Sequence, residues 1–119
     1  LEVGVEQVRE AATRGALGIA IRDKLAEVWL VFHVEDWLRP GTSGLPLCID
    51  QFESAVDLED DDEPDVLRFL LESFERTHPA AGPLRLEALA PVTVRIGDRI
   101  VRWPVRAFLP ADAPAREGT

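Results

Sequence analysis

The sequence predicts an α+β fold, a small single domain with antiparallel β-hairpins and two or three helices packed on the sheet. The length of 119 residues suits one domain. Alternating apolar residues around short turns indicate a hairpin in each half of the chain. Helical spacing of apolar residues before each hairpin indicates the helices. We expect the helices on one side of the sheet, residues 1–110 as the domain, and 111–119 as a flexible tail.

A short amphipathic helix is expected first, over residues 2–14. Val5, Val8 and Ala12 recur there at helical spacing. Gly15 follows at the position where a helix commonly ends, because glycine adopts the left-handed conformation of a C-cap without strain.

Residues 17–37 are expected to form a hairpin that turns at Asp23-Lys24. The β-branched and aromatic residues of its second half favour a strand over a helix. One face of this strand is apolar and carries Val28, Leu30, Phe32 and Val34. The opposite face is mixed and carries Glu27, Trp29, Val31 and His33. We therefore expect the strand to be central and covered at least partly on both sides.

A loop is expected after this hairpin. Residues 39–44 read Arg-Pro-Gly-Thr-Ser-Gly, a cluster of residues that break regular structure. A short apolar piece follows at 45–49, and residues 50–56 are compatible with the start of a helix capped by Asp50.

The clearest helix of the chain begins near Pro64, which suits the first turn because proline lacks the N–H that a helix start leaves unused. Its apolar residues run from Val66 to Phe74 at helical spacing. His78-Pro79 ends it, because the residue before a proline is disfavoured in the helical conformation.

The second hairpin has the strongest strand pattern. Apolar residues alternate up to Ile96, and Gly97-Asp98 forms a two-residue turn with glycine first. This turn predicts a register in which Val94 faces Val101 and Val92 faces Trp103. Pro104 has no N–H for a ladder, so we expect the second strand to be an edge strand or to be bulged there.

Composition excludes several classes of protein. The chain has 13 basic and 22 acidic residues, a formal net charge of −9, which disfavours binding to nucleic acid or anionic lipid. Its one cysteine forms no internal disulfide. The longest apolar run, residues 28–32, is too short to span a membrane, and we expect a cytoplasmic location.

One acidic segment, residues 57–65, accounts for most of the net negative charge. Its seven acidic residues are Asp57, Glu59, Asp60, Asp61, Asp62, Glu63 and Asp65. Without these seven charges the net charge changes from −9 to −2. The segment is either a solvated loop leading into a helix N-terminus, or a surface that attracts a basic partner. A calcium loop is a third reading, although the EF-hand spacing and glycine are missing.

The second hairpin carries the opposite charge. Four arginines against Asp98 give it +3, and they are Arg95, Arg99, Arg102 and Arg106. Such residues either neutralise the acidic segment within the fold or, beside Trp103, resemble the composition of a nucleic-acid-binding surface.

The function predicted first is a non-catalytic acidic protein-interaction domain of the inhibitor, immunity or regulatory-adaptor type. It would bind a basic protein partner through the acidic segment, with Trp37 as a further contact, and would need no cofactor or metal. The alternative for Trp37 is that it completes the core.

Two alternatives stay open. One is a small metal-binding or hydrolytic domain that uses His33, Asp36, Cys48 and His78, because these residue types ligate metals or form a thiolate pair. It requires side chains far apart in sequence to converge. The other is a structural subunit of a homo-oligomer, with a homodimer formed through the C-terminal edge strand.

Overall fold

The structure is a computed structural model, and it describes residues 2–4, 6–25, 27–37, 47–48, 54–57 and 63–113. Three α-helices lie in these ranges, and they are α1 (Glu6–Thr13), α2 (Val34–Trp37) and α3 (Glu63–Thr77). The strands are β1 (Glu2–Val3), β2 (Gly18–Asp23), β3 (Val28–His33), β4 (Leu47–Cys48), β5 (Ser54–Asp57), β6 (Leu84–Ile96) and β7 (Arg99–Pro110). A 3₁₀ turn at Pro79–Ala81 joins α3 to β6.

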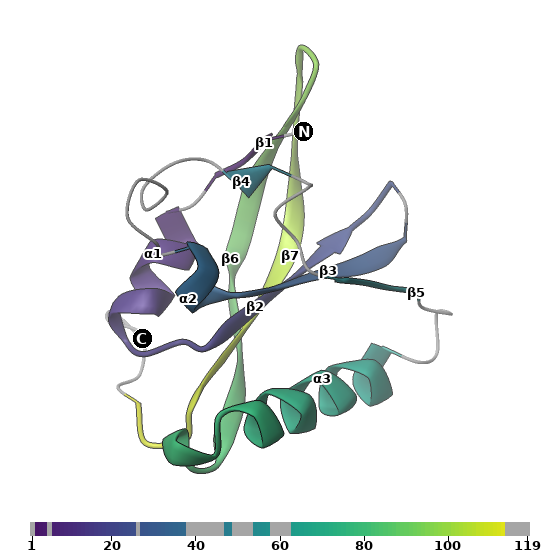
Figure 1. The fold of residues 1–119 in the computed structure, drawn as a ribbon. Coiled ribbons are helices and arrows are strands. Elements are labelled where there is room, and N and C mark those ends of the chain that lie inside the picture. Colours follow the sequence, from purple (N-terminus) through teal and green to yellow (C-terminus); the bar gives the residue numbers. More distant parts are fainter. Residues whose placement is uncertain are drawn as a thin grey trace.

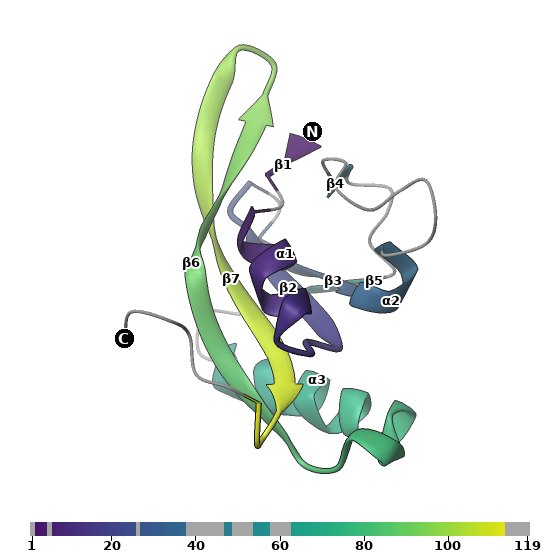
Figure 2. The same cartoon turned by 90° about the vertical axis from the view of Figure 1, so that its left-hand side faces the viewer.

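The described strands form one seven-stranded antiparallel sheet in the order β4-β1-β6-β7-β2-β3-β5, which confirms the predicted α+β fold (Figure 1). The long β6–β7 hairpin runs through the middle of the sheet, and its turn rises beyond the other strands in both views (Figures 1 and 2). None of the described helices combines the length and the apolar character needed to cross a bilayer.

Helices cover both faces of the sheet rather than the one face expected. The first core lies on the face of α1 and α2, and it contains Val8, Ile19, Leu30, Trp37 and Trp103 among others. The second core lies on the face of α3, and it contains Ala20, Trp29, Leu70, Phe74 and Phe108 among others. Successive residues along β2 and along β3 point to opposite faces of the sheet and so enter different cores. Helices must therefore pack on both faces to keep these apolar side chains from water.

The first hairpin is confirmed. β2 pairs with β3, and Oδ1 of Asp23 accepts a hydrogen bond of 2.9 Å from the backbone N–H of Leu25 at the turn. This local hydrogen bond is typical of aspartate in turns. The turn and the end of the hairpin differ from the prediction. Asp23 pairs with Val28, so the turn follows Asp23 and Glu27 lies in it with φ 58° rather than in the strand. Residues 34–37 form α2, because the chain passes from strand to helix at Val34.

The register of the second hairpin is also confirmed, with Val94 opposite Val101 and Val92 opposite Trp103. Gly97 has φ 61°, the left-handed value that the first residue of this turn requires and that glycine adopts without strain.

The pairing is irregular at Pro104, but the extra residue lies in β6 rather than in the second strand, where a bulge was expected. Leu89 pairs with Val105 and Val92 pairs with Trp103, so two residues of β6 face Pro104 alone. The other outcome, an edge strand, holds only for part of β7. Residues 105–108 pair with β2 as well as β6, so this half of the strand is internal.

Two further segments differ from the expectation. Helix α1 begins at Glu6, because Glu2 and Val3 form β1 and pair with β6. Residues 54–57 form β5 rather than part of a helix, because pairing with β3 satisfies the backbone groups on the outer side of that strand. Asp50, the expected cap, lies outside the described residues.

The C-terminal end of α1 is held on the sheet by an ion-pair network. Nη1 of Arg14 donates a hydrogen bond of 3.0 Å to Oε1 of Glu87 in β6, and a second bond joins Nη2 to Oε2. Nη2 of Arg85 lies 3.2 Å from the same Glu87 carboxylate. The hydrogen bond from Arg14 lowers the pKa of Glu87, and it outweighs the opposing effect of burial.

Candidate functional site

Three potential metal ligands converge where β3 runs into α2 and where α3 ends. His33 is the last residue of β3, Glu35 lies in α2, and His78 directly follows α3. One ligand atom from each residue lies within 4.8 Å of the other two. Imidazole and carboxylate are the side chains that ligate zinc and related divalent ions. The fold therefore brings a His₂Glu group together from segments 45 positions apart (78 minus 33).

The ring of His78 is held in an orientation that suits a metal ligand. Its Nδ1 lies 3.1 Å from the backbone carbonyl oxygen of Phe74 and 3.0 Å from Oγ1 of Thr77. A carbonyl oxygen only accepts hydrogen bonds, so Nδ1 is the donor in that contact. In the neutral ring Nε2 then carries the lone pair that can bind a metal. This Nε2 atom lies 3.9 Å from Oε1 of Glu35. Metal-binding histidines commonly donate their second ring N–H in this way.

An aromatic stack positions His33. The register of β2 with its two neighbours places Gly18 between Phe108 and His33. Phe74 from α3 occupies the space above Gly18, with its ring centroid 4.7 Å from that of His33 and 4.7 Å from that of Phe108. The two imidazole centroids are 5.4 Å apart. Phe74 thus contacts His33 through its ring and His78 through its carbonyl oxygen.

Glu35 leaves the site open to solvent. Its side chain is 74% exposed, whereas that of His78 is 18% exposed. Tetrahedral zinc with bonds near 2.1 Å places its ligand atoms about 3.4 Å apart, so a pair of ligand atoms 4.8 Å apart has to approach by about 1.4 Å to bind. The exposed Glu35 side chain can move toward the two imidazoles by changing rotamer. Three protein ligands would leave one tetrahedral position for water.

The structure brings together part of the predicted metal set. His33 and His78 converge as that alternative requires. Asp36 lies in α2 but outside the group, and Glu35 takes its place. Cys48 lies in β4, with four strands between it and β3 in the sheet order, so the backbone does not place it beside His33.

Sequence reasoning missed Glu35 for a specific reason. Asp36 was predicted on its residue type alone, whereas the period-two alternation of a continued strand would place residue 35 on the face of His33. In the structure the chain becomes helical at Val34, and Glu35 still lies with His33 and His78.

The acidic segment is only partly described. Asp57 ends β5, Glu63 begins α3, and Asp65 is exposed in the first turn of that helix. Glu59, Asp60, Asp61 and Asp62 lie outside the described residues. The described acids at the start of α3 lie where the helix dipole favours negative charge. Binding of a basic partner by this segment stays a prediction.

Trp37 corrects one expectation. It was expected as a contact for the partner, but it is only 3% exposed and belongs to the first core. A side chain this deeply buried contributes to stability rather than to an interface, because a partner cannot reach it without moving α2.

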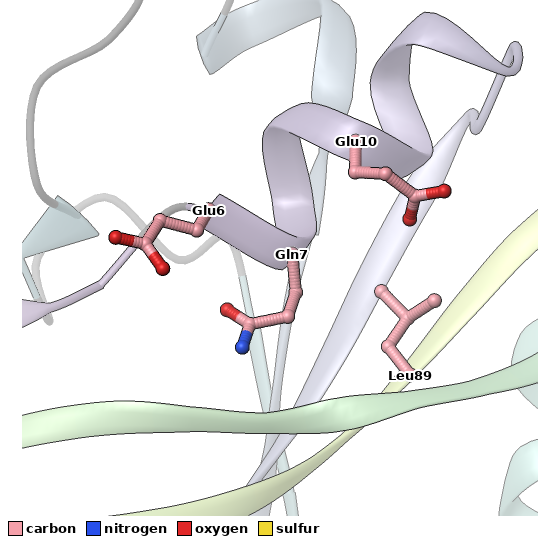
Figure 3. A pocket seen from close by; sticks show the side chains of 4 residues that line it. All are labelled: Glu6, Gln7, Glu10 and Leu89. Atoms are coloured by element: carbon pink, nitrogen blue, oxygen red, sulfur yellow. The ribbon is translucent and has the colours of Figure 1, made fainter. Parts of the chain in front are cut away.

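A shallow depression of about 220 Å³ lies between α1 and β6 (Figure 3). It is lined by Glu6, Gln7, Glu10 and Leu89. Nε2 of Gln7 donates a hydrogen bond of 3.2 Å to the carbonyl oxygen of Pro91, and Glu10 forms an ion pair of 2.8 Å with Arg14. Two of its polar side chains are thus engaged in holding α1 on the sheet.

No known protein family, curated protein or solved structure matches this chain.

Proposed function

We propose that this chain is a metal-binding domain that holds one divalent transition-metal ion of the zinc class between His33, Glu35 and His78. The observation that carries the proposal is the convergence of two imidazoles and one carboxylate from three separate elements, with ligand atoms within 4.8 Å of one another. Two neutral imidazoles and one carboxylate match the preferences of zinc better than those of magnesium or calcium, which favour all-oxygen sites.

The orientation of His78 supports the proposal independently of that convergence. A histidine at a helix end has several rotamers available, and this one presents Nε2 toward Glu35 while Nδ1 faces the carbonyl oxygen of Phe74. The ring is thus already arranged as a ligand, with an outer hydrogen bond of the kind that orients metal-binding histidines.

A bound ion would connect the end of α3 to the β3–α2 junction. Because the ligands come from elements that separate on unfolding, the folded state would bind the ion and the unfolded state would bind it weakly. At a free ion concentration 100 times the dissociation constant, this linkage stabilises the fold by about 2.7 kcal/mol. The open fourth position would hold a water molecule, which zinc activates for hydrolytic chemistry.

The test is a zinc titration of the tag-free protein after treatment with a chelator. We expect one zinc ion per chain by calorimetry, and cobalt(II) at the same site should give the absorption bands of a tetrahedral complex. Glu35→Gln is expected to weaken binding at least roughly tenfold. Asp36→Asn is the matched control, because it removes the neighbouring acid that lies outside the group.

Circular dichroism of each variant would confirm that it folds before its affinity is compared. Absence of stoichiometric binding to the folded wild-type chain would refute the metal site. An equal loss of affinity in Asp36→Asn and Glu35→Gln would also contradict the assignment, since it would indicate general attraction to acidic residues.

A further inference from the structure

We propose that the free edge of β7, residues 99–104, binds an extended acidic segment of a partner protein, which joins the sheet as an additional strand. This inference concerns a surface separate from the metal site and goes beyond the proposed function. It depends on the backbone of β7, on three arginines and on one exposed apolar side chain.

The outer half of β7 has one strand neighbour in the described part of the chain. β6 pairs with β7 along its length, whereas β2 reaches only residues 105–108. The corresponding edge of β6 is covered, because β1 pairs there with Val94 and Arg95. The hairpin therefore has one covered edge and one open edge, and Figure 2 shows its turn standing clear of the helices.

The turn type defines which backbone groups the open edge presents. In a two-residue hairpin the flanking pair, Ile96 and Arg99, exchanges hydrogen bonds, so the next pair, Arg95 and Ile100, points its N–H and C=O groups outward. On the β6 side, β1 lies opposite Arg95 and can take those groups. On the β7 side, Ile100 presents the same groups to solvent, and unpaired groups of this kind are a template for another strand.

The side chains at the outer end of the hairpin, on β7 and on the neighbouring Arg95 of β6, define the chemistry of the partner. Arg95, Arg99 and Arg102 are exposed, and none of the three forms an ion pair with another residue that the structure describes. Ile100 stands among them with 70% of its surface exposed. Arginine pairs with carboxylate through two parallel hydrogen bonds. Arg95 stands opposite Ile100 across the hairpin, so Arg95, Ile100 and Arg102 share one face and Arg99 lies on the other. A strand that alternates acidic and apolar residues would therefore place its carboxylates beside Arg95 and Arg102 and its apolar side chains on the face of Val101.

Two other occupants fit this edge less well. A second copy of the chain, paired β7 to β7, would bring six arginines together, three from each copy, and like charges across a strand pair destabilise it. Nucleic acid would lack an exposed aromatic side chain on which to stack at this edge, since Trp103 is 1% exposed.

The test uses a fluorescently labelled peptide of alternating Glu and Val, about eight residues long. The intact protein is added stepwise to this peptide, and binding is measured by fluorescence anisotropy. We expect saturable binding that weakens with salt. Arg95→Gln with Arg102→Gln should lower the affinity at least roughly tenfold. The matched control is Arg68→Gln with Arg76→Gln, two exposed arginines of α3, and it should leave the affinity within about twofold of wild type.

A second pair of variants tests strand addition itself. Ile100→Pro removes the outward N–H but keeps all three arginines, and proline is tolerated where a strand's N–H faces solvent. Ile100→Thr loses the apolar side chain and keeps the N–H. Strand addition predicts weaker binding in Ile100→Pro than in Ile100→Thr.

Equal binding in these two variants would overturn strand addition. Tighter binding to a DNA duplex than to the peptide, or concentration-dependent dimers that the arginine variants remove, would overturn the assigned partner. A chelator should leave peptide binding unchanged, so this result is independent of the zinc titration.

Discussion

Phe74 lies directly over Gly18, so that a Cβ atom on this glycine would come closer than 3.0 Å to three atoms of the phenylalanine ring. Gly18 pairs with Phe108 on one side and with His33 on the other. The missing side chain leaves a gap in the sheet surface that the ring of α3 fills. This single contact therefore couples the docking of α3 to the position of both histidines of the candidate metal site.

Gly18→Ala is expected to destabilise the protein and to weaken zinc binding together. The added methyl group must displace the Phe74 ring, and overpacking of this kind costs roughly 1–3 kcal/mol of unfolding free energy. Urea denaturation gives the stability and calorimetry gives the zinc affinity. Gly4→Ala is the control, because a Cβ there meets its nearest atom, the carbonyl oxygen of Thr93, at an ordinary 3.5 Å.

Phe74→Leu in the same background should restore part of the stability, since the smaller side chain makes room for the methyl group and the two effects are then not additive. A Gly18→Ala protein as stable as wild type would show that Phe74 does not occupy this gap.

His78→Asn should separate the structural role of the ring from its metal role. The asparagine amide nitrogen can replace Nδ1 as the donor to the Phe74 carbonyl oxygen, but nothing replaces Nε2. We expect zinc binding to be lost as fully as in His78→Ala. In the presence of a chelator, thermal unfolding should show His78→Asn more stable than His78→Ala by about 1 kcal/mol. Zinc affinity near wild type in His78→Asn would contradict a role for Nε2.

Glu87→Gln should change how stability depends on pH. The Arg14 guanidinium holds the pKa of Glu87 below its usual range, so the folded state favours the ionised carboxylate more than the unfolded state does. The resulting stabilisation is complete above the usual glutamate pKa of about 4.3, and it is lost as the pH falls through the lowered folded value.

Urea unfolding between neutral and acid pH measures this effect. Glu87→Gln should lower the stability at neutral pH by roughly 2 kcal/mol, because it weakens hydrogen bonds to a charged group, and its acid profile should be flatter than that of wild type. Glu72→Gln, at an exposed position on α3, should keep the wild-type profile. Parallel profiles for wild type and Glu87→Gln would contradict the role of the Arg14 pair.

The sequence by itself determined the local features of the fold. The turn at Gly97-Asp98 and the alternation around it are enough to place Val94 opposite Val101, since a two-residue loop leaves one register. The end of α1 at Gly15 and the end of α3 at His78 follow from backbone preferences of the same short range.

Only the tertiary structure decided how these pieces meet. Residues 54–57 become a strand because β3 offers them hydrogen-bond partners, and α3 covers the face opposite α1 because Trp29 and Val31 need cover there. His33 and His78 converge through the docking of Phe74 on Gly18, a contact between residues 56 positions apart (74 minus 18). Periodicity and turn residues report on near neighbours along the chain, whereas such pairings arise from burial and backbone hydrogen bonding across the whole domain.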